Sequence, residues 1–151
     1  MPVRRFTIYW LPVIVWMTLI FAGSTGALSS QQTSRFIGPI LRWFSPDASD
    51  ETVRAIQYGI RKSGHLTEYA ILAALLWRAR RKPKLHPHKP WLRSDAIFAI
   101  GIAALYAVTD ELHQSFQPTR QGSVWDVLID TLGAGLGILA IWMIGRWRKR
   151  W

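Results

Sequence analysis

The longest uncharged stretch of the chain most constrains its fold. Residues 6–27 carry no charged side chain over 22 positions, and a helix of that length crosses the hydrocarbon core of a bilayer. Tyr9 and Trp10 stand at its start, where amphipathic rings suit the headgroup level. These features predict a membrane-spanning helix and argue against a soluble globular fold. The last three residues, Thr-Gly-Ala, resemble a signal-peptidase site, so removal of the segment is the alternative.

Three further segments predict an all-α integral membrane bundle. Segments 59–77 and 95–114 have short apolar cores, and segment 124–142 has spanning length but contains Asp126 and Asp130. The connection after the first segment carries Pro39 and Pro46 and includes an amphipathic stretch, 37–44, that suits a membrane surface. We therefore expect one domain, residues 1–151, with four transmembrane helices at about 6–27, 59–77, 95–114 and 124–142.

Positive charge is distributed unevenly over the predicted loops. With four spans, 13 of the 19 Lys and Arg residues fall in the N-terminal arm, the second-to-third loop and the C-terminal tail. Cytoplasmic loops are enriched in such residues, so both termini are expected on the cytoplasmic side of the cell membrane. These cations need only attract anionic lipids, and no nucleic-acid-binding motif accompanies them. Membrane lipids are therefore expected as partners, and nucleic acid is not.

Several common chemistries lack their motifs here. The chain has no Cys, which excludes disulfides, thiol nucleophiles and Cys-ligated metals. No Gly-x-Ser-x-Gly sequence indicates a serine hydrolase, and no His-x-x-x-His or His-Glu-x-x-His sequence indicates a metal site. His86 and His88 lie in a Pro-rich tract, 83–90, that is typical of a solvated loop. No cofactor is expected and no metal is assigned. Side chains of types that bind metals are His65, Glu111, His113 and Asp126.

Polar residues gather at one level of the predicted membrane segments. The second segment begins, the third ends and the fourth begins at the outer side. Ionisable groups inside a membrane are costly, face a bundle interior or a water-filled cavity, and mark functional sites. We therefore expect a polar pocket open to the outer face. Its candidate ligand-binding residues are Lys62, His65, Tyr69, Glu111, His113, Gln114, Arg120, Asp126 and Asp130. Catalytic candidates, with no role assigned, are His65, Glu68, Asp110, Glu111, His113 and Asp126.

Helical spacing places these residues on shared faces. Lys62, His65 and Tyr69 follow an i, i+3, i+7 spacing and share one face. Asp126 and Asp130 form one stripe with two glycines three and seven residues after Asp130. Glycines in this arrangement let a neighbouring helix approach closely, so both aspartates are expected to point into the bundle. Two carboxylates one turn apart repel, so either a cation lies between them or one keeps its proton.

Three motifs occur in order along the chain: RKSGHLTEYA at 61–70, TDELHQSFQPTR at 109–120 and GSVWDV at 122–127. Together they resemble the VanZ-like family of bacterial membrane proteins. Thr119 stands where the family usually has Gly in Pro-Gly-Arg, and Ser24-Thr25 stands where many members have Ser-Ser-Gln. The resemblance implies a bacterial inner-membrane protein. The family's namesake is linked to low-level resistance to teicoplanin, a glycopeptide antibiotic acting on the cell wall, but the resemblance implies no defined reaction.

Three classes of function fit this sequence. The first is a protein that binds or modifies a polar or anionic cell-envelope component, such as a lipid-linked intermediate, with Lys62 and Arg120 holding the anion. The second is an intramembrane hydrolase or transferase acting on lipid-linked phosphate, with His65 or His113 as general base. The third is a structural or assembly role in which the polar residues form a salt-bridge network. A homodimer with the site near its seam is compatible with each.

Overall fold

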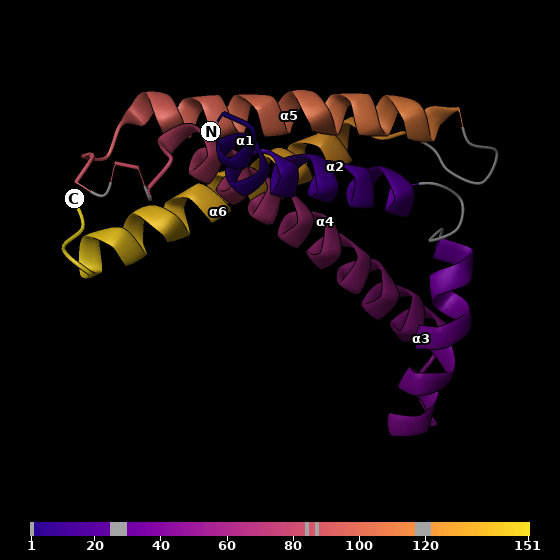
Figure 1. The fold of residues 1–151 in the computed structure, drawn as a ribbon. Coiled ribbons are helices and arrows are strands. Elements are labelled where there is room, and N and C mark those ends of the chain that lie inside the picture. Colours follow the sequence, from indigo (N-terminus) through magenta and orange to yellow (C-terminus); the bar gives the residue numbers. More distant parts are fainter. Residues whose placement is uncertain (1, 25–29, 84, 87, 117–121) are drawn as a thin grey trace.

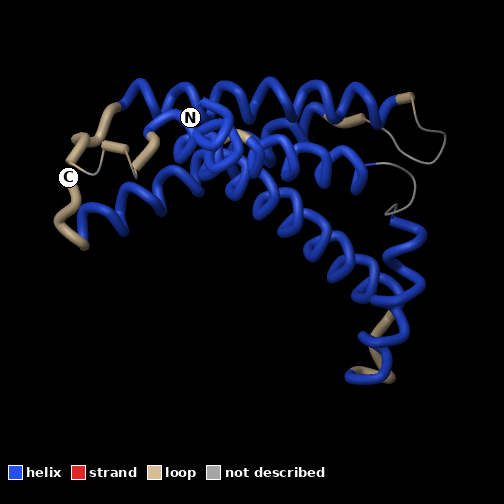
Figure 2. Tube along the Cα trace, viewed as in Figure 1, coloured by secondary structure: helices blue, strands red, loops and turns tan. Residues whose placement is uncertain are grey.

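The computed structural model of the chain describes residues 2–24, 30–83, 85–86, 88–116 and 122–151. Within these ranges all regular structure is α-helical, as the sequence predicts (Figure 2). Figure 1 shows a bundle in which α2, α4, α5 and α6 lie together, while α3 packs beside the first half of α4, away from the other helices. The helices are α1 (Pro2–Tyr9), α2 (Leu11–Ser24), α3 (Ser30–Phe44), α4 (Asp50–Arg81), α5 (Arg93–Ser115) and α6 (Val124–Trp147).

The predicted first helix is divided by a bend. α1 and α2 meet at an angle of 44°, because Pro12 has no N–H to donate and its ring crowds the preceding turn. Hydrogen bonds from Trp10 N to Phe6 O (2.8 Å) and from Ile14 N to Trp10 O (3.0 Å) continue across the bend. The expectation of one continuous helix over residues 6–27 is therefore corrected, and residues 25–27 lie outside the described part of the chain.

The expected connection before the second span contains two stretches of helix. α3 includes Pro39. α4 begins well before residue 59 because Ser49 caps it, its side chain accepting a hydrogen bond from Thr52 N at 3.2 Å. α4 ends where Lys82 adopts the left-handed conformation, with φ of 51°. The predicted segment 59–77 is thus the middle and end of a longer helix. By contrast, α5 and α6 begin within two residues of the predicted starts at 95 and 124.

α4 and α6 pack closely against each other along two glycines. A Cβ on Gly133 would lie 2.9 Å from Leu66 Cα, and one on Gly137 would lie 2.8 Å from Ala70 Cα. Side chains do not approach a backbone that closely, so these positions need glycine. The expectation of a close helix approach along this stripe is confirmed. The same stripe carries Asp130, whose side chain is fully buried.

The core between the helices is apolar and thin. α5 contributes Ala99, Ala103 and Ala107, one per turn and all fully buried, and α4 contributes the larger Tyr69 and Leu72. Small residues on one helix facing large residues on another bring the two helix axes close together. Along α5 the apolar core ends at Asp110, one turn after Ala107, because the buried side chains from there on are polar.

The outward faces of α2, α5 and α6 carry large apolar side chains that the rest of the chain leaves exposed, including Leu19, Leu105 and Leu132. Such faces suit lipid better than water. Among the described residues, α5 and α6 are long and apolar enough to cross a membrane, and the bent pair α1 and α2 makes a third span if it acts as one. α4 does not reach this standard. Length and composition therefore support two or three spans, and the predicted number of four is not confirmed.

Candidate functional site

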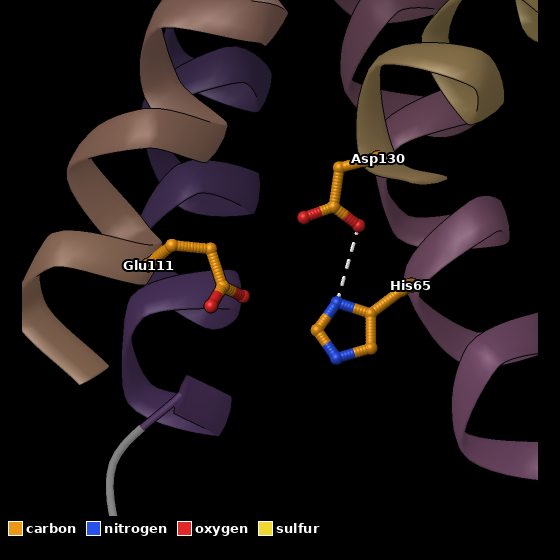
Figure 3. Close-up of side chains that lie close together, drawn as sticks. All are labelled: His65, Glu111 and Asp130. Atoms are coloured by element: carbon orange, nitrogen blue, oxygen red, sulfur yellow. Dashed lines mark hydrogen bonds and ion pairs between the residues drawn. The ribbon is translucent and has the colours of Figure 1, made fainter. Parts of the chain in front are cut away.

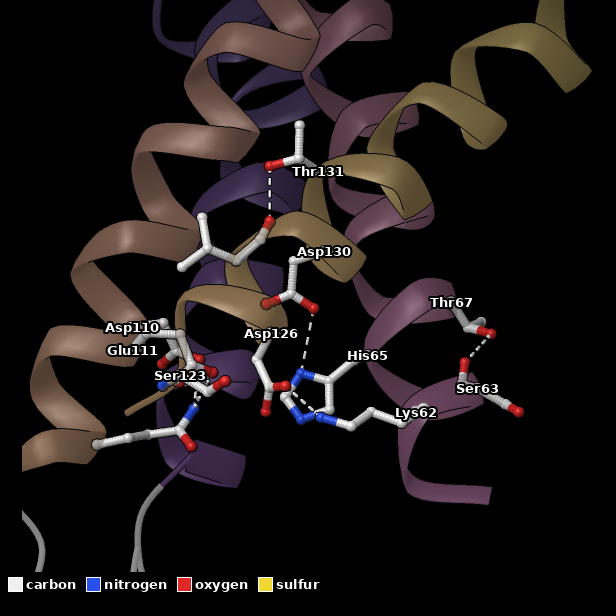
Figure 4. A network of polar contacts seen from close by, with 12 residues as sticks. Lys62, Ser63, His65, Thr67, Asp110, Glu111, Ser123, Asp126, Asp130 and Thr131 are labelled. Atoms are coloured by element: carbon white, nitrogen blue, oxygen red, sulfur yellow. Dashed lines mark hydrogen bonds and ion pairs between the residues drawn. The ribbon is translucent and has the colours of Figure 1, made fainter. Parts of the chain in front are cut away.

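Polar side chains of α4, α5 and α6 meet where α5 ends and α6 begins (Figure 4). Some of the bonded pairs are far apart in the sequence, such as His65 and Asp130, which are 65 residues apart. We call these side chains the polar cluster. Its members are Lys62, His65, Asp110, Glu111, Gln114, Asp126 and Asp130.

Two contacts between charged or ionisable groups join α4 to α6 in the polar cluster. Lys62 Nζ forms an ion pair with Asp126 Oδ1, and both side chains are 13% exposed. One turn further along, His65 Nδ1 lies 3.1 Å from Asp130 Oδ1 in a hydrogen bond. The two contacts lie one above the other, because Lys62 and His65 are three residues apart on α4 and Asp126 and Asp130 are four residues apart on α6. Residues at these spacings share one face of a helix. Lys62 thus already has an anionic partner within the chain.

Glu111 and Gln114 connect α5 to the start of α6. Gln114 Nε2 donates to Asp110 Oδ2 at 3.0 Å and to Glu111 Oε1 at 3.3 Å. The backbone N–H of Ser123 donates to Glu111 Oε2 at 2.8 Å. Ser123 is the N-cap residue of α6, so Glu111 contacts one of the N–H groups that the beginning of a helix leaves unpaired. Glu111 therefore fixes the beginning of α6 against the end of α5.

Negative groups outnumber positive ones in this region. Among the described residues, two side chains with a permanent positive charge, Arg61 and Lys62, accompany five carboxyl groups. These are Glu68, Asp110, Glu111, Asp126 and Asp130. Carboxylates held close together in a poorly hydrated place destabilise one another unless protons or cations compensate them. Within the described residues, side chains of permanent positive charge therefore compensate only part of this negative charge.

Buried oxygen atoms without partners are a second sign of this imbalance. Within the described ranges, Asp130 Oδ2, Asp110 Oδ1 and the Tyr69 hydroxyl are buried and have no hydrogen-bond partner. More than nine in ten buried polar groups in proteins have one. The three atoms belong to three different helices, α6, α5 and α4. Each of the three long helices therefore contributes one buried oxygen without a partner among the described residues.

His65, Glu111 and Asp130 converge within the polar cluster (Figure 3). One nitrogen or oxygen from each lies within 4.8 Å of the corresponding atoms of the other two. The sequence singled out His65 and Glu111 as metal-binding types, and the structure adds Asp130. His113 has a different environment, because its ring packs on Phe21 of α2 with centroids 4.4 Å apart.

A cavity of about 230 Å³ lies beside the polar cluster, between α2, α4 and α5. His65, Asp110 and Gln114 belong to both the cluster and the cavity wall. The remaining wall residues are Ile20, Gly23, Ser24, Ile60, Arg61, Gly64 and Glu68. Sequence reasoning missed the contribution of α2, because α2 is uncharged and has no polar pattern. The polar level itself, including catalytic candidates Glu68 and Asp110, was visible in the sequence.

Six of the described residues that were predicted to bind a ligand are not part of the cavity wall: Lys62, Tyr69, Glu111, His113, Asp126 and Asp130. Tyr69 is fully buried in the core, with its ring centroid 6.5 Å from that of Tyr106. The Asp126 carboxylate forms an ion pair with Lys62 Nζ. Arg120, which was expected to hold an anion, lies outside the described residues.

Comparison with known proteins identifies the family of the chain. The chain matches the VanZ/LLP1 family over residues 7–145, nearly its whole length. Curated proteins and solved structures give no match. The matched range includes the motifs at 61–70, 109–120 and 122–127, which supply every member of the polar cluster except Asp130, itself within the range. The chain belongs to the VanZ/LLP1 family.

Proposed function

We propose that the chain is a four-span protein of the cell membrane whose polar pocket binds the headgroup of an envelope lipid or lipid-linked intermediate. The single observation that carries this proposal is the cavity of about 230 Å³ lined by Arg61, His65, Glu68, Asp110 and Gln114. Ligand sites are usually concave and contain a few convergent polar groups. Polar groups inside a membrane bundle are costly and are retained for function.

The arrangement of charge supports an outward-facing pocket. Arg78, Arg80 and Arg81 lie at the end of α4, and Arg146 lies near the end of α6. The polar cluster lies far from these residues, in the first turns of α6 and in the middle of α4. If the basic residues face the cytoplasm, the bent pair α1 and α2 together with α4, α5 and α6 supply four spans, and the pocket opens toward the envelope. α3 and the first half of α4 then lie on that side.

The cavity wall suits a headgroup that carries both signs of charge. The Arg61 guanidinium pairs well with a phosphate oxygen. Glu68 and Asp110 accept hydrogen bonds from hydroxyl or ammonium groups. A bare anion would meet these carboxylates and be repelled. We therefore place zwitterionic and hydroxylated phospholipids, and lipid-linked phosphates with sugar or amino groups, ahead of simple anions as ligands.

A melting-temperature series on the detergent-purified chain tests this function. The panel holds a polyprenyl phosphate, phosphatidylethanolamine, phosphatidylglycerol and, as a lipid without a charged headgroup, diacylglycerol. We expect at least one phosphate lipid to raise the melting temperature by about 5 °C at saturation. Arg61→Gln should abolish that rise. Arg54→Gln, on the same helix but exposed and outside the cavity, should keep it. Equal behaviour of diacylglycerol and the phosphate lipids, or a full rise in Arg61→Gln, contradicts the proposal.

A second candidate is an intramembrane hydrolase or transferase on lipid-linked phosphate. The 3.1 Å contact between His65 Nδ1 and Asp130 Oδ1 favours it, because a carboxylate that orients an imidazole is a common arrangement around a general base. This candidate predicts release of phosphate or headgroup from the stabilising lipid. Turnover should be lost in His65→Gln. A lipid that binds the wild-type chain and is recovered unchanged would exclude the enzyme and leave the binding function.

A further inference from the structure

We propose that His65, Glu111 and Asp130 form a binding site for a divalent metal ion of the Zn²⁺ and Mn²⁺ class. The three residues come from α4, α5 and α6, so the ion would join all three long helices. One imidazole and two carboxylates are ligand types shared by these metals. The chain has no Cys that would favour a softer ion.

The separations are close to those of a ligand shell. At metal–ligand bonds of roughly 2.0–2.2 Å, neighbouring ligand atoms lie about 2.9–3.6 Å apart. His65 Nδ1 and Asp130 Oδ1 are 3.1 Å apart, within that range, and an ion bound by both atoms would replace the hydrogen bond between them. One atom from each of the three residues falls within 4.8 Å of the others. Glu111 therefore needs a shift of about an ångström, which a Glu side chain with three rotatable bonds can provide.

The unpartnered oxygen of Asp130 is an independent observation. Asp130 is 0% exposed, and its Oδ2 has no hydrogen-bond partner among the described residues. In Figure 3 this second oxygen points toward Glu111 and away from His65. A buried carboxylate oxygen without a donor costs stability, and a cation between Asp130 and Glu111 would satisfy it.

The charge balance of the region also favours a cation over another donor. Lys62 contacts Asp126, and Arg61 lines the neighbouring cavity. The carboxylates of Glu111 and Asp130 have no side chain of permanent positive charge as a contact within the described chain. Two positive charges on one ion would neutralise this pair.

His65 lines both the metal site and the cavity of about 230 Å³. Three protein ligands leave room for a further ligand on a zinc ion, so a phosphate oxygen in the cavity has a position to occupy. An ion there would add to the positive charge that Arg61 brings to this otherwise acidic pocket. This last role rests on the proposed headgroup binding, whereas binding of the metal itself does not.

Metal content of the full chain tests the site directly. The chain is purified in detergent without a His-tag, stripped with a chelator, and dialysed against micromolar Zn²⁺ or Mn²⁺. We expect about one ion per chain by elemental mass spectrometry, and a melting temperature about 5 °C above that of the stripped protein. Asp130→Asn and Glu111→Gln, which keep size but remove charge, should each lower the bound metal at least tenfold.

Two controls separate this site from adventitious binding. Asp95→Asn removes a buried carboxylate at the other end of the bundle, and the double variant His86→Ala/His88→Ala removes two exposed loop histidines. Both should keep the full metal content. Less than a tenth of an ion per wild-type chain, binding retained in Asp130→Asn, or binding lost with His86 and His88 would each overturn the site.

X-ray absorption of the zinc-loaded wild type keeps the test decisive if the variants do not fold. One imidazole nitrogen with oxygen ligands supports the site, and two or more imidazoles contradict it. Because no lipid takes part in these measurements, failure of the metal site and failure of headgroup binding are distinguishable.

Discussion

The two ends of the helical bundle bury charged groups in opposite ways. At the basic end, Asp95 is 3% exposed and accepts hydrogen bonds from Arg80 Nε at 3.1 Å and Lys89 Nζ at 2.6 Å. Arg81, also 3% exposed, donates to the backbone oxygens of Pro90 and Lys89. Both carboxylate oxygens of Asp95 and the Arg81 guanidinium thus have partners within the chain.

The polar cluster does not reach this balance. One oxygen atom each of Asp110 and Asp130 is buried without a hydrogen-bond partner in the described chain. A buried charge that serves stability alone is normally paired and hydrogen-bonded. Within the described chain the basic end also has buried atoms without a hydrogen-bond partner, the Tyr9 hydroxyl and Trp77 Nε1, but these groups are uncharged. The difference in how the two ends treat buried charge supports the proposed role of the polar cluster, because an arrangement that costs stability persists where something outside the chain compensates it.

The largest effect is expected where α4 and α6 touch, because that contact holds both ends in place. Gly133→Ala adds a Cβ that overlaps the Leu66 backbone, which cannot move without separating the helices. We expect a loss of about 3 kcal/mol in the free energy of unfolding, measured by circular dichroism during titration with a denaturing detergent. In Gly135→Ala on the same helix, the new Cβ meets nothing within 4 Å. That variant should gain up to about 1 kcal/mol. Similar losses in both would contradict close packing at Gly133.

The ion pair of the polar cluster gives the next largest effect. Lys62→Met leaves the Asp126 carboxylate, 13% exposed, without its cation. We expect a cost of about 2–3 kcal/mol. Adding Asp126→Asn should recover part of it, and the double-mutant cycle should give a coupling energy of about 1–2 kcal/mol. Additive losses in the double variant would mean that the two side chains act independently.

Sequence reasoning located the polar level well because membrane helices make polar residues conspicuous. His65, Glu111 and Asp130 stood out in otherwise apolar segments. The stripe from Asp126 to Gly137 correctly indicated the close approach of a neighbouring helix, which the structure identifies as α4. Helix periodicity is a local property, so one helix's own residues are enough to define its face.

Sequence reasoning was less successful where structure depends on contacts between distant segments. Nothing local showed that α2 closes one side of the cavity or that Asp130, rather than His113, joins His65 and Glu111. The bend before Pro12 and the cap at Ser49 were visible in the sequence. The expected segments rested on hydropathy, which predicts where lipid is tolerated and does not predict where a helix begins.

The two ends can be compared directly by the free energy of unfolding that one Asp→Asn substitution costs at each end. A chelator is present, so that no bound metal contributes to the difference. Asp95→Asn removes the charge that two cations share, and we expect it to cost about 2 kcal/mol, because Arg80 and Lys89 are partly exposed and can reach water. Asp130→Asn removes a carboxylate whose Oδ2 is unpartnered, and it should cost less than about 1 kcal/mol. Denaturing-detergent titrations of both variants measure the difference. A larger loss in Asp130→Asn would contradict this difference between the two ends.

The smallest effect concerns the aromatic cover of the basic end. Trp151 lies near Trp77 and Trp91, with ring centroids 5.9 Å and 5.4 Å away, and the Arg81 guanidinium is 4.9 Å from its ring. Trp151→Ala should cost about 1 kcal/mol, because the ring is only partly buried while Arg81 keeps its two carbonyl acceptors.

Trp147→Ala is the matched control for this change, since Trp147 is 81% exposed and its loss should shift the melting temperature less. Metal content and lipid-induced stabilisation should be unchanged in Trp151→Ala, because the polar cluster lies at the other end of α4 and α6. A loss of either property would mean that the two ends are coupled through these helices. The basic end would then influence the site instead of only supporting the fold.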